Sequence, residues 1–265
     1  MTERRRLALI TGASSGIGAE YARQLASQGV NLILTARNET RLRSVAREVR
    51  DAYGVEAEII LADLAGREGI DKLAARIKEA TDLDLLINNA GFGAPVALAE
   101  ADTEVQLAMM SVHMTATMLL TKAALPAMIA RRRGQIINVT STSAFIPVPL
   151  GLNYTATKAY VIGFSESLQQ EVAEQGIQVQ AVCVGYTHTG FHSSETWNQD
   201  MSWIPDEYWM EAEDVVRESL EQLGKNGVIY VTGQINRDGI AAVMRNLYFL
   251  PGTNWLARLA RWLRR

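Results

Sequence analysis

The chain is poor in cysteine and in long apolar runs, and each shortage excludes a class of protein. Cys183 is the only cysteine among 265 residues, so no intrachain disulfide can form. It lies within the apolar run Val-Gln-Ala-Val-Cys-Val, which indicates a core position rather than a nucleophile. No apolar run reaches the roughly 18 residues of a membrane span. We therefore expect a protein of a reducing compartment without a spanning segment.

Basic residues near the N-terminus raise the alternative of a secretory signal. Arg4, Arg5 and Arg6 precede the apolar run Leu-Ala-Leu-Ile. Thr11 and Gly12 end that run below the roughly 7–15 apolar residues that a signal requires. We interpret the segment as a polar lead-in to a strand and expect a cytoplasmic location.

The net charge is small, and histidine is scarce. The formal net charge is −3, which gives no reason to expect nucleic acid as a partner. Hydrophobic residues make up 48% of the chain, enough for a large core and against disorder. His188 and His192 are close in sequence, but the spacing suggests no third ligand, so we expect no metal site.

Short apolar runs alternate with amphipathic helical stretches along the chain. The predicted strands cover residues 7–10, 30–36, 57–62, 83–87, 135–139, 177–184 and 228–232. The predicted helices follow the first strand to about residue 28 and then cover 38–53, 66–80, 103–130 (with a kink at Pro126) and 154–175. The strands are continuously apolar, as in a sheet covered on both faces. The pattern predicts a Rossmann-like α/β fold, a doubly wound sheet of about seven parallel strands with helices on both faces.

No composition break, internal repeat or low-complexity linker divides the sequence. We therefore expect one domain over residues 1–265, although the chain is long for a single domain by the guide of about 150 residues.

A glycine-rich turn separates the first predicted strand from the first helix. It contains Gly12, Gly16 and Gly18. Backbone amides at a helix N-terminus bind phosphate, and glycine allows the ligand to approach the backbone closely. The spacing is G-x-x-x-G-x-G rather than G-x-G-x-x-G, so the turn alone also fits a purely structural role. Its place after the first strand favours dinucleotide binding.

The end of the second predicted strand bears on the choice of cofactor. An acid at this place binds the ribose 2′-hydroxyl of NAD, whereas an arginine accommodates the 2′-phosphate of NADP. Ala36 stands where the acid is expected, and Arg37 supplies a cation. This predicts NADP(H) rather than NAD(H). The alternative is that Arg37 is a solvated charge at the start of the next helix.

Tyr154 and Lys158 are the strongest candidates for chemistry. They are four residues apart, so a helix places both side chains on one face. A fixed ammonium near a phenol favours the phenolate, so we expect Lys158 to lower the pKa of Tyr154 toward neutrality and to prepare it for proton transfer. Ser141, at the end of the preceding strand, is positioned to hydrogen-bond the same substrate oxygen. Taken alone, Y-x-x-x-K also fits an ordinary half-buried helical pair.

The motifs together resemble the short-chain dehydrogenase/reductase family over essentially the whole chain. The matching pieces, in order, are Thr-Gly-Ala-Ser-Ser-Gly-Ile-Gly at 11–18, Asp63-Leu64, Asn88-Asn89-Ala90-Gly91, Ser141, and Tyr154-Thr-Ala-Thr-Lys158. Each motif is weak alone, but their order and their places on the predicted elements make the combination specific.

The resemblance implies a role for each matching position. Tyr154 would be the general acid in reduction and the base in oxidation, Lys158 would bind the nicotinamide ribose, and Ser141 would polarise the substrate carbonyl. The residues expected at the cofactor are Gly12, Ser14, Ser15, Gly16, Ile17, Gly18, Arg37, Asp63, Leu64, Asn89, Ala90, Gly91, Tyr154, Lys158, Gly185, Thr187 and Thr189.

Two positions depart from the family pattern. His113 stands where the family usually has an asparagine that holds a water for proton relay. A neutral histidine can hold a water, so His113 is a candidate catalytic residue, and a buried histidine bonded to the backbone is the alternative. Val184-Gly185 replaces the usual Pro-Gly after the sixth strand, a change that frees one backbone amide. We expect cofactor binding to survive it.

Two segments near the C-terminus have a distinct composition. Residues 190–212 correspond to the family's substrate lid and contain Trp197, Trp203 and Trp209, which suggests a bulky apolar substrate or a lid packed on the core. Residues 254–265 form an amphipathic helix with leucine and tryptophan on one face and arginine on the other. Docking on protein is favoured over binding to a membrane surface.

The sequence therefore predicts an NADP(H)-dependent oxidoreductase. It would interconvert a ketone or aldehyde and an alcohol on a bulky apolar small molecule. The alternative is a dinucleotide-binding sensor or scaffold with little catalysis, which His113 favours and the intact Ser141, Tyr154 and Lys158 oppose. By resemblance we also expect a homodimer or homotetramer, formed through the helices at about 103–130 and 154–175.

Overall fold

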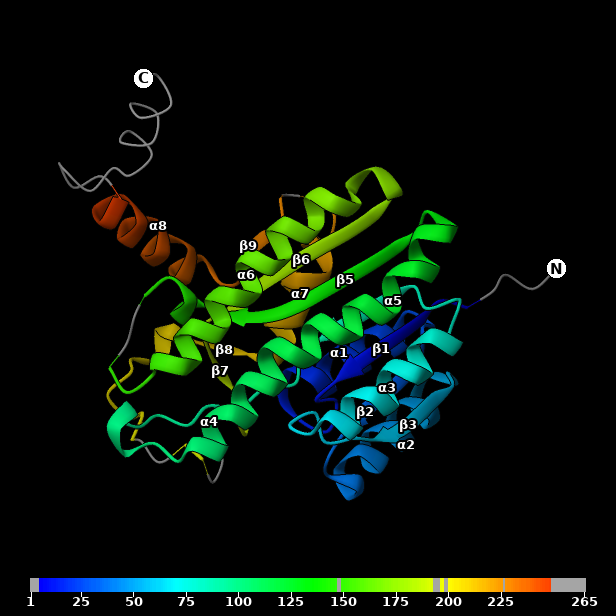
Figure 1. The fold of residues 1–265 in the computed structure, drawn as a ribbon, viewed down its shortest axis with the longest axis horizontal. Helices are drawn as coiled ribbons and strands as arrows, with labels where there is room; N and C mark the ends of the chain where they lie inside the picture. Colours follow the sequence, from blue (N-terminus) through cyan, green and yellow to red (C-terminus); the bar gives the residue numbers. More distant parts are fainter. Residues whose placement is uncertain (1–4, 147–148, 193–195, 198–199, 226, 249–265) are drawn as a thin grey trace.

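A seven-stranded parallel sheet forms the centre of the protein (Figure 1). The computed structural model describes residues 5–146, 149–192, 196–197, 200–225 and 227–248. The strand order is β3-β2-β1-β4-β5-β6-β9, and every pair is parallel. The doubly wound sheet predicted from the sequence is confirmed. The strands are β1 (Leu7–Thr11), β2 (Asn31–Ala36), β3 (Ala57–Leu61), β4 (Leu85–Asn88), β5 (Gly134–Ser141), β6 (Ile177–Val184) and β9 (Ile229–Val231).

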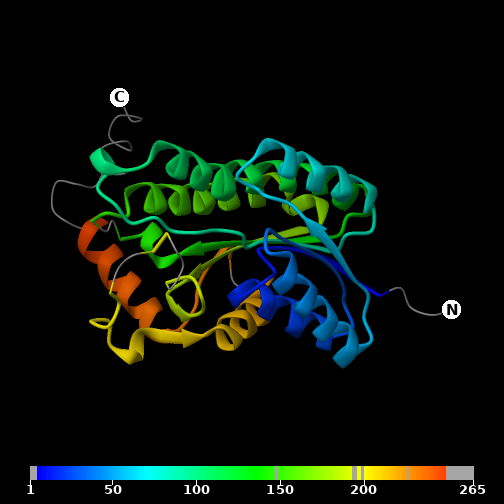
Figure 2. The ribbon, with the colours of Figure 1, turned by 90° about the horizontal axis from the view of Figure 1, so that it is seen from below.

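Helices cover both faces of this sheet, as Figure 2 shows from below. One face carries α1 (Gly16–Ser27), α2 (Glu39–Tyr53) and α7 (Ala212–Gln222). The other carries α3 (Arg67–Glu79), α4 (Thr103–Met110), α5 (Thr117–Arg131) and α6 (Leu152–Val172). Each face has its own apolar core, one around Leu25 and Leu42 and the other around Leu73 and Leu120. The apolar strands are therefore buried from both sides, as their composition predicted.

The long predicted helix at 103–130 is irregular, but at a place that the sequence did not indicate. Six residues, Ser111–Ala116, form a π-helical turn between α4 and α5, and His113 lies within it. Pro126 lies inside α5, which continues through it. The π-helical turn lies about three to four helical turns before Pro126, and π-helical turns are frequent at functional sites.

The combined helix Thr103–Arg131 is long and apolar enough to cross a membrane by length and composition alone. It packs against α3, and half of its most apolar window is buried inside the protein. This is the behaviour of a core helix, which passes the same test.

The region after β6 contains four elements that the sequence did not predict. β7 (Tyr186–His188) and β8 (Trp209–Glu211) form a separate parallel pair, with Thr187 opposite Met210. α7 precedes β9, and α8 (Gln234–Tyr248) follows it. Short 3₁₀ turns occupy Leu98–Glu100, Thr142–Ala144, Ala173–Gln175 and Asp206–Tyr208. The predicted amphipathic helix at 254–265 lies outside the described residues.

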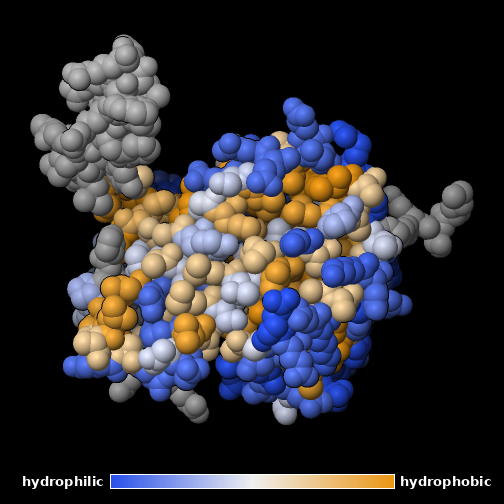
Figure 3. All heavy atoms as spheres, viewed as in Figure 1, coloured by the Kyte–Doolittle hydropathy of each residue, from blue (hydrophilic) through white to orange (hydrophobic). Residues whose placement is uncertain are grey.

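The molecular surface is not uniform in hydropathy. Figure 3 shows hydrophilic residues gathered over α2 and α3, and more hydrophobic residues over α4 and α5. Leu107, Met110 and Ile129 are exposed apolar residues of the second group. This composition bears on assembly, to which we return below.

Candidate active site

Ser141, Tyr154 and Lys158 come together where β5 ends and α6 begins. Ser141 is the last residue of β5, and the other two occupy the first turns of α6. The side chain of Tyr154 is hydrogen-bonded to that of Ser141. The Lys158 ammonium lies 5.6 Å from the centre of the Tyr154 ring. The structure thus places the three residues that the motifs singled out in one group at the carboxyl end of the sheet, where parallel α/β sheets bind ligands.

A neighbouring serine fixes the orientation of Ser141. The backbone amide and the hydroxyl of Ser143 both donate to Ser141 Oγ, at 3.2 and 3.0 Å. Because Ser141 accepts twice, its own proton is left for donation toward Tyr154 or a substrate oxygen. Ser143 was missed by the sequence analysis. The N-cap signal of a serine followed two residues later by a second serine could have indicated it.

Lys158 is held by the backbone of β5. Its side chain is only 5% exposed, and its ammonium donates to Val139 O at 3.1 Å. Thr140 Oγ1 donates to Lys158 O at 2.8 Å. Burial lowers the pKa of Lys158 to about 8. The side chain is therefore mostly a cation at neutral pH, close to the point at which it loses its charge.

The pKa of Tyr154 is the opposite of our expectation. Burial raises it to about 12, and the hydrogen bond with Ser141 offsets only part of that rise. The prediction of a pKa near neutrality was wrong for this structure because burial, which removes the phenolate from water, has the largest effect on its pKa. At neutral pH Tyr154 consequently keeps its proton, the state required of a general acid.

His113 is buried between two elements of the site. It is 2% exposed, and the Phe92 amide donates to its Nε2 at 3.2 Å. Since Nε2 accepts, the ring proton lies on Nδ1, 2.8 Å from Thr157 Oγ1. Thr157 in turn donates to Tyr154 O at 2.9 Å. Burial and then the charge of Lys158 hold the pKa of His113 well below its usual value, so the ring is neutral.

Both ring nitrogens of His113 are therefore engaged by protein groups. A Cβ added at Gly91 would lie 2.9 Å from His113 Nε2 and 3.6 Å from Lys158 Nζ, so the ring fills the space up to the backbone beside the lysine. These contacts are those of the alternative interpretation, a buried histidine bonded to the backbone. A role for His113 in proton relay stays a prediction.

The glycine-rich turn is built by backbone packed on backbone. A Cβ at Gly18 would lie 2.3 Å from Gly12 O, and one at Gly12 would lie 2.9 Å from Ala90 Cα. Gly12 and Gly16 have φ values of +68° and +53°, which favour glycine. Asn89 Nδ2 donates to Thr11 O at 2.9 Å, and Thr11 Oγ1 accepts from the amides of Asn89 and Ala90 at 2.9 Å. Thr11 thus joins β1 to the turn after β4.

The other predicted residues of this end lie around the same turn. Ser15 is the N-cap of α1 without a side-chain capping bond, and Ile17 packs on the core below. Thr189 lies against Gly16, where an added Cβ would be 3.0 Å from Thr189 Cβ. Ser14 is partly buried next to Ser15. Thr189 is therefore brought from beyond β6 to the N-terminus of α1.

Arg37 and Asp63 occupy the ends of β2 and β3. Arg37 is exposed, and the structure gives it no ion pair within the described residues. Asp63 Oδ1 accepts from Ala65 N at 3.0 Å, which fixes the turn, while Leu64 is buried. The exposed guanidinium of Arg37 thus lies between the end of β2 and the first turn of α2.

Gly185 lies in the turn after β6, and Thr187 lies in the adjoining strand β7. Thr187 is buried, and its hydroxyl donates to Gly185 O at 3.1 Å. A Cβ at Gly185 would lie 2.4 Å from the side-chain amide of Asn236. The residues predicted to bind the adenosine half and those predicted to bind the nicotinamide half thus border the same edge of the sheet.

These residues fit a dinucleotide. The turn at 12–18 offers the amides of a helix N-terminus, which suit a phosphate group, and its glycines let the turn pack closely on the neighbouring backbone. Lys158, Tyr154 and Ser141 lie at the other end of the same edge. The chemistry of the residues present therefore suits a nicotinamide dinucleotide.

The lid aromatics divide into three environments. Phe191 lies 6.0 Å from the Tyr154 ring and 5.4 Å from Trp197, between ring centres. Trp197 packs on Gly93, where a Cβ would lie 2.5 Å from the indole. Trp209 stacks on His188 at 4.9 Å, and Trp203 is 70% exposed. Only one of the three predicted tryptophans thus reaches the site.

A small pocket that Tyr154 helps to line has an aliphatic wall. Val96 N donates to Leu150 O at 2.9 Å and closes it. Leu150 has φ +62°, a conformation rare in residues of this type and common at functional sites. The apolar residues that line the pocket are Ala94, Val96, Leu98, Ala101, Leu150 and Leu152.

His188 and His192, weighed above as metal ligands, are held by aromatic rings. His188 stacks on Trp209, and the ring centre of His192 lies 4.8 Å from that of Trp197. The described part of the chain contains no group of three potential ligands around a common point.

Comparisons with known proteins show which family the chain belongs to. The short chain dehydrogenase family model matches residues 6–200. The inactive hydroxysteroid dehydrogenase-like protein 1 of Homo sapiens is 35% identical over 202 residues, which are 75% of this chain and 61% of that protein. The chain thus spans less than two thirds of that relative's length.

Two solved structures cover almost the whole chain. The short-chain dehydrogenase from Sphingobium yanoikuyae in complex with NADPH has a TM-score of 0.82 and 31% identity, and covers 91% of this chain and 94% of its own. The bulky-bulky ketone specific alcohol dehydrogenase from Comamonas testosteroni has a TM-score of 0.78 and 29% identity, over 92% and 94%. The chain belongs to the short-chain dehydrogenase/reductase family, as its motifs indicated.

Proposed function

We propose that the protein is an NADPH-dependent reductase of ketones or aldehydes with bulky apolar substituents. The observation that carries the proposal is the group formed by Ser141, Tyr154 and Lys158, with a protonated phenol near Phe191 and a pocket with an aliphatic wall. The bound cofactor supplies the hydride.

Each residue of the group has a distinct task in reduction. Ser141, oriented by Ser143, donates to the carbonyl oxygen and polarises it. Tyr154 donates its proton to the same oxygen as negative charge develops there. The cation of Lys158 opposes the charge left on Tyr154, which makes the proton easier to release in the transition state. The raised pKa of Tyr154 keeps the phenol protonated at neutral pH, the state from which it donates in reduction.

The preference for NADPH rests on Arg37. Its exposed guanidinium follows β2, where Ala36 takes the place of an acid, and a similar solved structure contains NADPH. Arg37→Ala should weaken NADPH binding about 10- to 100-fold, as expected for loss of a charged hydrogen bond, and leave NADH binding unchanged. Titration of protein fluorescence with each cofactor measures both. Tighter binding of NADH by the wild type would refute the preference.

The substrate class follows from the apolar side chains around Tyr154. Phe191 lies near Tyr154 and packs on Trp197, and Tyr154 also lines the aliphatic pocket, so apolar substituents of a carbonyl at Tyr154 would meet apolar side chains. A similar structure is of an enzyme specific for bulky ketones. NADPH oxidation, followed by absorbance across a panel from acetone to diaryl ketones, tests the class. Faster turnover of the smallest ketones would contradict it.

A second candidate is a dinucleotide-binding sensor or scaffold with little catalysis. It is favoured by the two engaged nitrogens of His113 and by a 35% identical relative described as inactive. Tight NADPH binding with no turnover of any carbonyl in the panel would select it. Turnover that requires Tyr154 would reject it.

Assembly and location complete the proposal. We place homodimer or homotetramer contacts on the long helix of α4 and α5 and on α6, where Leu107, Met110 and Ile129 are exposed. The proposed location is the cytoplasm. Sedimentation of wild type and Leu107→Glu tests the assembly, since a charge at the contact should shift the protein toward the monomer.

A further inference from the structure

The first turn of α8 packs directly on the turn that follows β6. A Cβ added at Gly185 would lie 2.4 Å from Asn236 Nδ2 and 2.8 Å from both Cγ and Oδ1. The flat amide of Asn236 therefore lies face-on against the Gly185 backbone. These residues are 51 positions apart in sequence, so α8 must dock before the contact exists.

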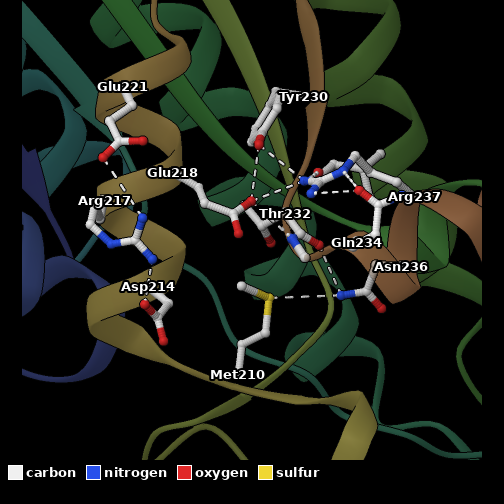
Figure 4. Close-up of polar contacts among 12 residues, drawn as sticks. Met210, Asp214, Arg217, Glu218, Glu221, Tyr230, Thr232, Gln234, Asn236 and Arg237 are labelled. Atoms are coloured by element: carbon white, nitrogen blue, oxygen red, sulfur yellow. Dashed lines mark hydrogen bonds and ion pairs between the residues drawn. The ribbon is translucent and has the colours of Figure 1, made fainter.

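The amide of Asn236 is itself fixed by two neighbours. Its Nδ2 donates to Thr232 O at 2.9 Å and lies 3.9 Å from Met210 Sδ (Figure 4). Met210 is opposite Thr187 in the β7–β8 pair, and Thr187 donates back to Gly185 O at 3.1 Å. Contacts thus run in a closed ring through Asn236, Gly185, Thr187 and Met210.

A partly buried carboxylate anchors the helix that carries Asn236. Glu218 Oε2, on α7, accepts from Tyr230 Oη at 2.9 Å, from Gly233 N at 3.0 Å and from Arg237 Nη1 at 3.0 Å. Arg237 also donates to Val231 O at 2.9 Å. Figure 4 shows that this network joins α7, β9 and α8. One carboxylate therefore sets the position of the first turn of α8.

The turn at Gly185 also borders the dinucleotide site. Thr187 and Thr189 extend from it, and Thr189 packs on Gly16 at the N-terminus of α1. Val184, in place of the family's proline, leaves the start of this turn without the restriction on φ that proline imposes. Asn236 supplies an external contact that restrains the turn at Gly185.

We propose that Asn236 is a positioning residue for the nicotinamide half of the cofactor site. It acts through Gly185 and Thr187 by holding the turn after β6 in the shape that receives the cofactor. The assignment rests on the proposed dinucleotide function, but not on any turnover of substrate. The glycine-rich turn, which receives the adenosine half, is held by Thr11 and Asn89 and should not depend on Asn236.

Binding of the whole cofactor and of its adenosine half separates this role from a general structural one. Asn236→Ala should weaken NADPH binding about tenfold, the equivalent of one hydrogen bond and its packing, and leave binding of 2′,5′-ADP unchanged. The matched control is Arg245→Ala, since the hydrogen bond that Arg245 makes among the described residues stays within α8, to Ala241 O at 3.2 Å. It should bind both ligands as the wild type does. Isothermal titration measures all four affinities.

A second variant guards against loss of folding. Asn236→Asp keeps the size but cannot donate to Thr232 O, and should also weaken NADPH selectively. Unchanged 2′,5′-ADP binding shows that each variant is folded. Equal loss of both ligands, or no loss of NADPH binding in either variant, would overturn the proposal.

Failure of the proposed function gives a different result. A wild type that binds NADPH but reduces no carbonyl leaves the Asn236 test intact and refutes only the reductase. A wild type that prefers NADH is tested with NADH and 5′-AMP instead. In either case the selective loss in Asn236→Ala is the expected result.

Discussion

The two ends of the site are closed by different means. At the dinucleotide end, backbone packs on backbone, and a Cβ at Gly18 would lie 2.3 Å from Gly12 O. At the substrate end, side chains pack on one another, with Phe191 5.4 Å from Trp197 between ring centres. The first arrangement tolerates one residue type at each position and so leaves a motif in the sequence. The second tolerates many, which explains why the motifs identify the reaction and not the substrate.

The largest effect on activity should come from the catalytic group, which lies where the dinucleotide end and the substrate end meet. Tyr154→Phe removes the proton donor while keeping the ring, so carbonyl reduction should fall about 100- to 10,000-fold. NADPH binding should stay within about threefold of the wild type, since the hydroxyl is directed to Ser141. Steady-state rates and cofactor titration measure the two. Appreciable turnover in this variant would show that another group donates the proton.

The next largest effect should come from the backbone contacts of the dinucleotide end. Gly18→Ala places a methyl group 2.3 Å from Gly12 O, which cannot yield without opening the turn. We expect a loss of about 1–3 kcal/mol of stability and of measurable NADPH binding. Thermal unfolding and cofactor titration provide the two readouts.

Gly163→Ala is the matched control for this substitution. Gly163 lies in α6, and an added Cβ there meets no atom within 4 Å. Alanine in a helix should stabilise by about 0.4–1 kcal/mol and leave cofactor binding intact. If both glycine variants bind cofactor equally, the turn does not carry the ligand.

The contrast between the ends also decides what the sequence could predict. The parallel sheet, the turn at Gly12 and the catalytic positions follow from apolar runs and fixed spacings, which are local. The environments of Trp197 and Trp203 depend on which distant residue each meets, and sequence spacing treats them alike. α7 could have been found from the helical repeat of Val215, Val216 and Ser219, which are its buried residues. The raised pKa of Tyr154 depends on burial in three dimensions, which spacing does not contain.

The substrate end gives a smaller and selective effect. Trp197→Ala removes an indole that packs near Tyr154 through Phe191, and Trp203→Ala removes one that is 70% exposed. The first should reduce kcat/KM for diaryl ketones about tenfold or more, from the lost apolar contact, and the second less than about twofold. NADPH binding should be unchanged in both. Equal effects of the two variants would show that Trp197 does not border the substrate.

The smallest effect concerns His113 and appears in stability rather than in rate. The folded protein holds the pKa of His113 well below 6.5, whereas the unfolded chain binds a proton as pH falls through that value. The wild type should therefore lose stability as pH falls below about 6.5, down to the folded pKa. His113→Asn should remove that part of the pH dependence, and should lower stability near pH 8 by about 1 kcal/mol through loss of a bond to Phe92 or Thr157. Melting temperatures of both proteins from pH 5 to 8 test this, and parallel curves would mean that His113 is charged or exposed in solution.

The pH profile of the reduction rate should be the same in the wild type and in His113→Asn, because the ring of His113 is neutral throughout the working range. Lys158, with a pKa of about 8, should set that profile in both proteins. A profile that changes with the substitution would instead assign His113 to the proton path.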